Sequence, residues 1–268
     1  MYINIANHNF SIIWDNVYYF TLSDYPNISN YELKKILLFI EYEKIHNRNT
    51  EIICENDKIM EAVNYALINP IQFLSEQPPK IITECTACHQ KGCLTEYLCH
   101  TASVEDAKSI LKCGNIFSAV KARNKTETEL AKEPRNSAND PQDYFNYIMF
   151  SWGNCQAGDR LVMERMLKRK PDEIDLSTGF IPGVRFYFEY KTITKHNDYV
   201  NDGYHPAKIK NELILSDYLY CCIIPEQYKT DFIDIIPINL FNKVIYLEND
   251  CDNIFDWSEK VYNFICNI

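Results

Sequence analysis

The sequence predicts an α+β fold, in which helices and strands are mixed without regular β-α-β alternation. Three observations support this prediction. Apolar residues alternate in several short segments and recur at helical spacing in others, and the two kinds of segment follow each other irregularly along 268 residues. Hydrophobic residues make up 46% of the chain and charged residues 24%, values typical of a folded globular protein.

The N-terminal part begins with strands and continues with a helix. Alternating apolar side chains over residues 9–21 indicate one or two strands. Ser29 and Glu32 then have the spacing of a capping box, in which each residue satisfies a free N–H group of the other. Leucine and isoleucine recur at helical spacing after them, so we expect a helix that begins at this box and ends near His46.

A domain boundary is expected shortly after a second helix. This helix covers about residues 57–68 and should end at Asn69-Pro70. The paired prolines of Gln77-Pro78-Pro79-Lys80 favour extended, unpaired backbone, which is typical of a linker. We therefore predict a small N-terminal α+β domain over 1–78 and a larger domain over 79–268.

The larger domain mixes further helices and strands around one long polar loop. Its helices are expected at 104–113, capped by Ser103 and stopped by Gly114, at 159–168 and at 254–266, its strands at 147–152, 184–191, 212–215 and 219–224, and its exposed loop at 120–143. Loops of this length inside a domain usually bind or cover a ligand, or are disordered.

Charge and targeting signals exclude several classes of protein. Acidic residues outnumber basic ones 37 to 27, which gives a net charge of −10 and argues against broad electrostatic docking on nucleic acid or anionic lipid. The sequence shows no signal peptide and no apolar run long enough to span a membrane. Eleven cysteines without a secretion signal favour a reducing, cytoplasmic environment.

Cysteine and histidine cluster in the segment CTACHQKGCLTEYLCH. The C-x-x-C pair of Cys85 and Cys88 would let two thiolates reach one zinc ion from a tight turn, and zinc takes four such ligands. Cys93, with Cys99 or His89, would complete the set. The spacing differs from that of fingers with two separated C-x-x-C pairs, so a structural zinc site and a set of unligated thiols both remain open.

Three later segments occur in a characteristic order: YLCHTASVEDAKSILKCGNIFSAVKAR, then YIMFSWGNCQAGDRLVMERML, then KIKNELILSDYLYCCIIP. Together they resemble the ADP-ribosyltransferase superfamily, in particular its DNA-modifying toxin branch. In that branch a His-Thr strand precedes a helix and an arginine, and a catalytic glutamate opens a late strand. The resemblance covers residues 97–225 and implies a mixed-sheet core of that family, NAD as cofactor and a macromolecular acceptor, either nucleic acid or protein.

The resemblance also implies roles for single residues. His100 and Thr101 would hold NAD near its nicotinamide end, Arg123 would contact the cofactor or the reacting centre, and Glu212 would be catalytic. Arg135 lies in the same loop as Arg123, and the arginine role remains open between the two.

The expected chemistry suits a carboxylate. Breaking the nicotinamide glycosidic bond develops positive charge on the ribose, as in other glycosyl transfers. A fixed carboxylate at Glu212 would stabilise this charge more than it stabilises ground-state NAD. Many superfamily members have Gln or Glu two residues before the catalytic Glu, whereas Lys210 stands here, which leaves the acceptor undefined.

Two other functions compete with the transferase. Asp172, Glu189 and Lys191 match the P-D…E-x-K pattern of many metal-dependent nucleases, whose carboxylates hold Mg²⁺ and orient a water. Strand alternation would place Arg185, Tyr187, Glu189 and Lys191 on one face, and an exposed strand face explains the pattern without any function. The third possibility is a zinc-stabilised interaction module without catalysis.

Overall fold

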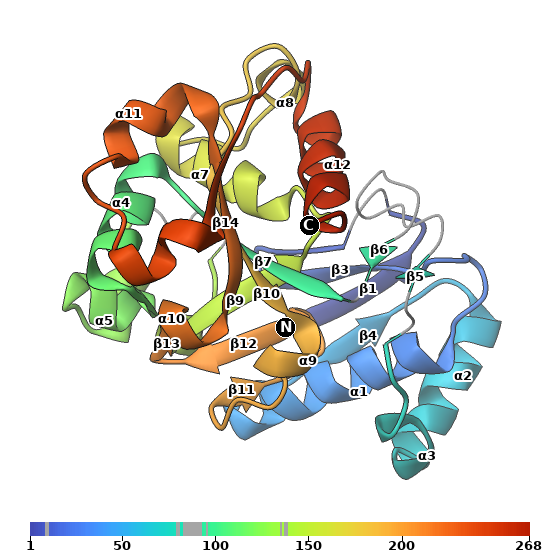
Figure 1. Ribbon diagram of the computed structural model, residues 1–268. Helices are drawn as coiled ribbons and strands as arrows, with labels where there is room; N and C mark the ends of the chain where they lie inside the picture. The colour runs from blue at the N-terminus through green and yellow to red at the C-terminus, as the bar shows by residue number, and fades with distance from the viewer. Residues whose placement is uncertain (9–10, 79–80, 83–92, 95, 135, 137–138) are drawn as a thin grey trace. The chain divides into compact units, whose positions relative to one another are not determined.

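The computed structural model describes residues 1–8, 11–78, 81–82, 93–94, 96–134, 136 and 139–268 (Figure 1). The chain is a mixed α+β protein, which confirms the predicted fold class. It folds as two compact units. The first consists of Met1–Thr95 with the short segments Ala138–Asp140 and Asn201–Pro206, and the second of Glu96–Ser137, Pro141–Val200 and Ala207–Ile268. The division therefore falls after residue 95 rather than after residue 78, and two later segments belong to the first unit.

The first unit is a four-stranded sheet covered on one face by two helices (Figure 1). The sheet order is β2-β3-β1-β4, and β1 runs parallel to both of its neighbours. The elements are β1 (Tyr2–Ala6), β2 (Ile12–Trp14), β3 (Val17–Thr21), α1 (Asn30–Ile45), β4 (Glu51–Ile53), α2 (Asp57–Ile68) and α3 (Ile71–Leu74). Every second side chain of β1 and β3 packs against α1 and α2 in one core, namely Ile3, Ile5, Tyr18 and Phe20 against Ile36, Phe39, Ile59 and Val63.

The helix starts of this unit follow the capping signals in the sequence. The Ser29 hydroxyl accepts the Glu32 N–H and the Glu32 carboxylate accepts the Ser29 N–H, so the predicted capping box of α1 is confirmed. Helix α1 ends at its C-cap His46, as expected. Helix α2 is capped by Asn56, whose side chain accepts two N–H groups of the first turn.

The second unit contains a seven-stranded sheet in the order β11-β12-β9-β7-β10-β14-β15. All neighbouring strands are antiparallel except β14 and β15, which are parallel. The strands are β7 (Tyr97–Ala102), β9 (Tyr147–Trp152), β10 (Val184–Glu189), β11 (Tyr199–Val200), β12 (Ala207–Lys210), β14 (Leu219–Pro225) and β15 (Val244–Leu247). A separate antiparallel pair joins β8 (Asn115–Phe117) to β13 (Glu212–Ile214).

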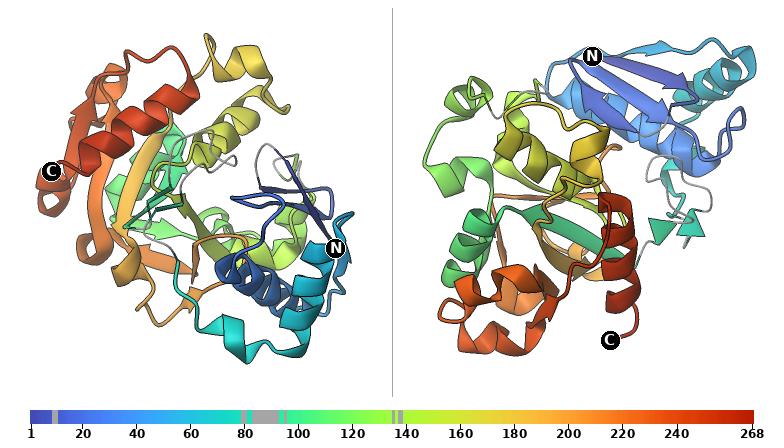
Figure 2. Two further views of the ribbon diagram at one scale, coloured as in Figure 1. Left: turned by 90° about the vertical axis from the view of Figure 1, so that its right-hand side faces the viewer. Right: turned by 90° about the horizontal axis from the view of Figure 1, so that it is seen from above.

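Different elements cover the two faces of the large sheet. One face, called here the α4 face, packs Leu98, Ala102, Phe150 and Phe186 against α4 (Val104–Cys113), β8, β13, α10 (Leu215–Tyr218) and α11 (Lys229–Phe232). The other, called the α12 face, carries Arg185 and Tyr187 and meets α7 (Ala157–Leu167) and α12 (Ile254–Ile265). Figure 2 shows α12 and α4 on opposite sides of these strands. This arrangement decides which side chains of a strand share a site.

Two sequence expectations for this unit are wrong. The region 120–143 is not one long loop, because it contains most of α5 (Ala119–Arg123), all of α6 (Glu127–Ala131) and the start of a 3-10 helix, η1 (Gln142–Asn146). The strand expected over 184–191 ends at Glu189, and α9 (Tyr190–Ile193) follows it. Within the described residues, no helix combines the length and apolar character needed to cross a membrane.

Candidate functional site

His100 lies near the end of β7 on the α4 face, just before α4 begins. Its ring contacts Phe150 edge-on, with ring centroids 6.2 Å apart. Its Nδ1 lies 3.1 Å from the backbone oxygen of Met149. Because a carbonyl oxygen only accepts hydrogen bonds, Nδ1 carries the proton and donates it. Burial lowers the pKa of His100 below its usual value, so the ring is neutral at pH 7 and its Nε2 is an acceptor.

The side chain of Thr101 points to the opposite face, because successive residues of a strand alternate. It fills the space under the N-terminus of α7, where a Cβ added to Gly158 would lie 2.2 Å from Thr101 Oγ1. A Cβ at Gly183 would lie 2.5 Å from Thr101 Cγ2. Cys99 Sγ is 3.6 Å from the same hydroxyl oxygen. The predicted pair of His100 and Thr101 therefore does not present both side chains to one ligand.

Glu212 is the first residue of β13, as the sequence predicts for a carboxylate that opens a late strand. The preceding Asn211 has a left-handed backbone with φ 67°. Its N–H donates to the backbone oxygen of Asn146 at 2.9 Å, and its own backbone oxygen accepts the Ser118 N–H at 2.7 Å. Leu213 then enters the core, whereas the Glu212 side chain is exposed. The turn at Asn211 thus fixes the carboxylate at the surface end of the strand.

Helix α5 brings two cations to this region. Lys121 Nζ donates to Glu212 Oε2 at 2.9 Å, and both side chains are largely exposed. Arg123 Nη2 lies 4.0 Å from Asp106 Oδ1, which belongs to the first turn of α4. These four side chains form a surface group of two acids and two bases, called here the α5 cluster. Arg135, the alternative to Arg123, lies outside the described residues.

Among the described residues, no recorded contact joins His100 to the α5 cluster. Burial lowers the pKa of His100 and so does the charge of Arg165, whereas the hydrogen bond to Met149 and the Asp106 carboxylate oppose this shift. The structure records no hydrogen bond or ion pair between His100 and Glu212 in the described part of the chain. Both belong to elements on the α4 face, since Leu213 of β13 shares a core with Leu98 and Ala102 of β7. Of the predicted cofactor and catalytic residues, Arg123 and Glu212 are thus linked through α5, which carries Arg123 and the Lys121 that pairs with Glu212, and His100 shares only the α4 face with them.

The predicted zinc ligands lie largely beyond what the structure describes. Cys85 and Cys88 are outside the described residues, and so is the side chain of Cys93. Cys99 is buried on the α12 face. Burial raises the pKa of Cys99 to about 11, and the nearby Arg185 guanidinium only partly opposes this. In the chain without a bound metal, the Cys99 thiol is therefore protonated at neutral pH. Among the described residues, no three His, Cys, Asp or Glu side chains gather to hold a metal.

The residues of the alternative nuclease site serve local structure. Asp172 is the N-cap of α8 (Glu173–Leu176) and accepts two backbone N–H groups of that helix. Glu189 accepts a hydrogen bond from the Thr192 hydroxyl at 2.8 Å. Lys191 belongs to α9 rather than to the strand. The structure records no contact between Asp172 and Glu189 within the described residues.

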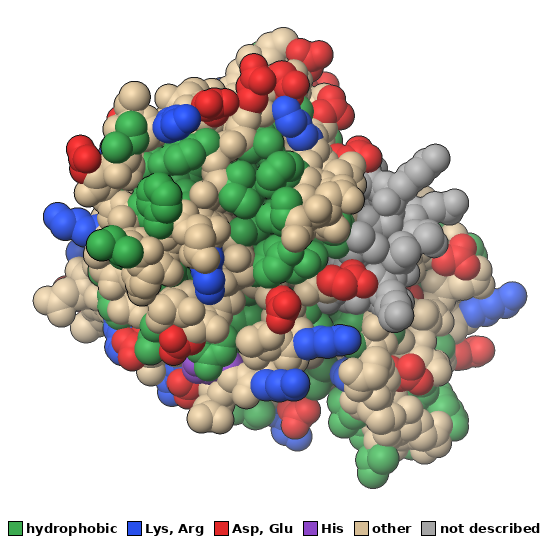
Figure 3. All heavy atoms as spheres, viewed as in Figure 1, with side chains coloured by type: hydrophobic (Ala, Val, Ile, Leu, Met, Phe, Trp, Pro, Cys, Tyr) green, Lys and Arg blue, Asp and Glu red, His purple; other side chains and the backbone are tan. Residues whose placement is uncertain are grey.

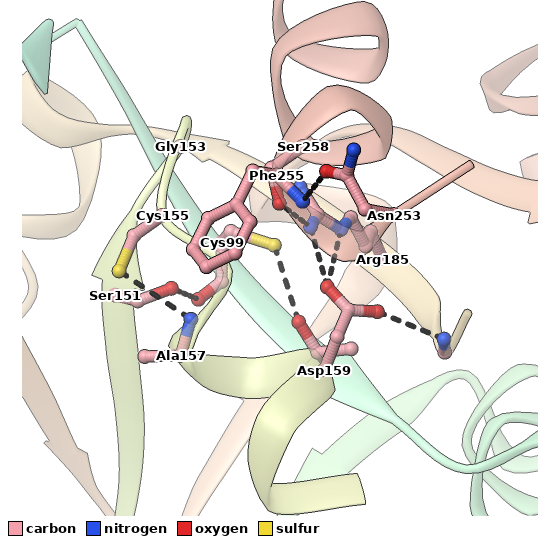
Figure 4. Close-up of polar contacts among 12 residues, drawn as sticks. Cys99, Ser151, Gly153, Cys155, Ala157, Asp159, Arg185, Asn253, Phe255 and Ser258 are labelled. Carbon is pink, nitrogen blue, oxygen red and sulfur yellow. Dashed lines mark hydrogen bonds and ion pairs between the residues drawn. The ribbon is translucent and has the colours of Figure 1, made fainter. Parts of the chain in front are cut away.

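A buried polar network, which the sequence analysis missed, lies on the α12 face (Figure 4). Arg185 and Tyr187 are fully buried, so the expectation of an exposed strand face is wrong. Arg185 Nε donates to Asp159 Oδ2 at 2.9 Å, and Arg185 Nη2 bonds to the same oxygen and to the hydroxyl of Ser258. Asp159 Oδ1 accepts the Gly183 N–H at 2.8 Å. The network joins α7, β10 and α12.

Charge compensation explains how this arginine is tolerated in the interior. Burial by itself lowers the pKa of Arg185, and the Asp159 carboxylate more than reverses this, so the net pKa is raised. The Tyr187 hydroxyl completes the network, since it accepts from Arg185 at 3.2 Å and donates to the backbone oxygen of Gly153 at 3.1 Å. The apolar residues Val184, Phe186 and Phe188 alternate with polar ones, which is the pattern of a strand with one solvent-facing side, so no local signal in the sequence marked this network.

Comparisons of the chain with protein-family models, with curated proteins and with solved structures found no match.

Proposed function

We propose that the second unit is an NAD-dependent ADP-ribosyltransferase that modifies a macromolecule, either nucleic acid or protein. The proposal rests on the order of the three sequence segments and on one observation above all. The Glu212 carboxylate stands exposed at the start of β13, beside a helix that also carries Arg123. This is where a carboxylate could meet the ribose of a dinucleotide held by the arginine.

Glu212 would act on the ribose. Its Oε2 is paired with Lys121, and both side chains remain open to solvent at 51% and 42% exposure, so a ribose hydroxyl can reach the carboxylate. As the glycosidic bond breaks, the negative charge would stabilise the cationic ribose more than the ground state. The ion pair with Lys121 would limit the rotation of the carboxylate.

His100 and Arg123 would bind the cofactor. The neutral His100 ring offers Nε2 as a hydrogen-bond acceptor, which suits a ribose hydroxyl and not a phosphate. Within the described part of the chain, the recorded ion pair of Arg123 is a long 4.0 Å contact to Asp106, so its guanidinium retains donors for a pyrophosphate. The Thr101 side chain is packed under α7, and the proposal assigns it no contact with NAD.

The experiment is a transfer assay with NAD labelled on its adenylate part, using DNA, RNA and protein acceptors. Wild type should label one acceptor class, and Glu212→Gln should lower the rate on the order of 100-fold to 1000-fold. Glu226→Gln is the matched control, because Glu226 is equally exposed and also faces a lysine, at 3.8 Å. Absence of transfer to every acceptor, or full activity in Glu212→Gln, would refute the proposal. Mg²⁺-dependent cleavage of nucleic acid lost in Glu189→Ala would favour the nuclease instead.

A further inference from the structure

One edge of the large sheet is formed by a short strand of apolar residues. Strand β15 is last in the sheet order and, among the described residues, pairs only with β14. Its sequence, Val-Ile-Tyr-Leu, contains no charge and no proline, and all four residues are only partly buried. Edge strands usually carry charges, prolines or bulges that prevent pairing with another chain.

Exposed apolar side chains continue this edge. Ile238 is 96% exposed, Phe241 71% and Ile233 58%, and the first two belong to the 3-10 helix η3 (Ile238–Lys243) that leads directly into β15. Figure 3 shows hydrophobic side chains gathered on this face of the molecule, over α11, η3 and β15. The three residues expose on the order of 400 Å² of largely apolar surface, which is the size of the largest apolar patch on a typical monomer, and such patches are often functional. Together with Val244–Leu247 they are called here the β15 patch.

The charged groups beside the patch are compensated within the chain. Lys229 lies 3.8 Å from Glu226 and stacks over the ring of Tyr246, 5.3 Å from its centroid. Lys243 Nζ donates to the backbone oxygen of Leu219 at 2.7 Å. The described residues beside the patch therefore do not present the concentrated positive charge that binding of nucleic acid or anionic lipid needs. The patch suits an uncharged apolar surface with a strand edge of its own.

We propose that the partner is a second copy of the chain. The β15 patches of the two copies would contact each other, so that the two β15 strands pair antiparallel about a two-fold axis. The opposite sheet edge, β11, is only two residues long. Strand β11 is therefore a poor pairing partner for β15. Two copies that pair through their β15 edges form a closed dimer and do not continue to add copies into a fibre. A stable dimer buries roughly 800 Å² per partner, about twice the exposed apolar area, so we expect moderate affinity, on the order of micromolar.

The first test is sedimentation of the full chain from about 1 to 100 µM, the range set by that affinity. The mass should rise from 31.5 kDa towards twice this value. Added salt should strengthen the dimer, because the net charge of −10 makes the copies repel each other. The Ile238→Asp/Phe241→Asp variant should stay monomeric. Ile174→Asp, at a 71% exposed position on α8, is the control and should dimerise like wild type.

The second test identifies the contact. Backbone amides of β15 should gain protection from hydrogen exchange as protein concentration rises, in wild type and in Ile174→Asp but not in the double variant. A chain that remains monomeric over the whole concentration range would overturn the proposal. So would a dimer whose β15 amides stay unprotected, or one that Ile174→Asp disrupts as strongly as the double variant does. Transferase activity plays no part in either readout.

Discussion

Cys99 and His100 are neighbours in β7, yet the strand sends one to the α12 face and the other to the α4 face. Burial disfavours the charged form of both groups, which means the thiolate in one case and the imidazolium in the other. The two pKa values consequently shift in opposite directions. Each shift leads to an experiment on a single side chain.

Cys99 should resist alkylation in the native protein. Burial both closes access to its thiol and raises its pKa to about 11, so almost no thiolate is present at a pH of about 8. The exposed Cys113 and Cys266 should react with iodoacetamide under the same conditions. Peptide mass mapping over time measures all three rates. Labelling of Cys99 as fast as that of Cys113 would contradict the buried position.

His100 should make stability depend on pH. Its folded-state pKa is lowered, so the unfolded chain takes up the proton first as pH falls. The associated stability is fully present above about pH 6.5, the unfolded-state value, and is lost as pH falls through the folded-state pKa. Urea unfolding between about pH 7 and 5 should show a shallower decline for His100→Gln than for wild type. Parallel curves for the two proteins would show that the ring titrates normally.

At the scale of elements, local signals in the sequence located most long helices. The capping box at Ser29 and the Ser103 cap with Gly114 at the C-cap, where φ is 73°, fix the ends of α1 and α4. The short helices were missed because a few residues produce no apolar period. One signal in that region was overlooked, since Thr126 and Glu129 form the capping box that begins α6.

The face of β10 was misjudged for a different physical reason. A polar residue in an alternating strand usually marks the solvent side, and Arg185 was interpreted in this way. It is buried only because Asp159 and Ser258, 26 residues before it and 73 residues after it, supply its partners. Pairing over such distances leaves no trace in local sequence. For the same reason the sequence suggested Glu212 and Arg123 as candidates but could not reveal the Lys121 that pairs with Glu212.

Removing one partner of the buried ion pair between Asp159 and Arg185 should lower the free energy of unfolding more than removing both partners. Asp159→Asn would leave Arg185 charged and buried, and we expect the free energy of unfolding to fall by about 3–5 kcal/mol. The double variant Asp159→Leu/Arg185→Met should lose less, because no uncompensated charge remains. Urea denaturation of both variants measures the difference. If the double variant is the less stable of the two, the ion pair is a net source of stability.

The packing of α7 and β10 around Thr101 can be tested by adding one methyl group. The new Cβ in Gly183→Ala would lie 2.5 Å from Thr101 Cγ2 and 3.0 Å from the backbone oxygen of Ala102, so we expect a loss of about 1–3 kcal/mol. Thr101→Ser removes Cγ2 and should restore part of this loss in the double variant. Gly179→Ala is the control, because its Cβ meets nothing closer than 3.5 Å. Thermal or urea unfolding measures all three, and no rescue by Thr101→Ser would rule out this contact.

At the scale of the whole molecule, the sequence indicated two units but not their composition. The proline pair at 78–79 suggested a simple boundary, whereas residues 201–206 return to the first unit. In sequence this segment looks like an ordinary connection between β11 and β12. Its glycine fits so closely that a Cβ at Gly203 would lie 2.1 Å from the backbone oxygen of Lys35 in α1. Such a contact depends on the completed fold.

The returning segment should stabilise the first unit selectively. The Tyr204 ring packs against Tyr18, with ring centroids 5.0 Å apart, and its hydroxyl accepts the Ile13 N–H at 3.4 Å. Tyr204→Ala should therefore reduce hydrogen-exchange protection in β1 and β3 while β10 and β14 stay protected. Truncation of a large packed aromatic typically costs about 3–5 kcal/mol. Tyr2→Ala, at a 42% exposed position, is the control. Equal loss in both units would mean that they unfold together.

Two segments of the first unit lie, in sequence order, between segments of the second unit. The two units therefore alternate along the chain rather than following one another. A single crossover in the gene therefore cannot replace one unit by the corresponding unit of another protein, because one of the two units would be left incomplete. An engineer who wishes to separate the two units will need to graft replacements for both Ala138–Asp140 and Asn201–Pro206 onto the first.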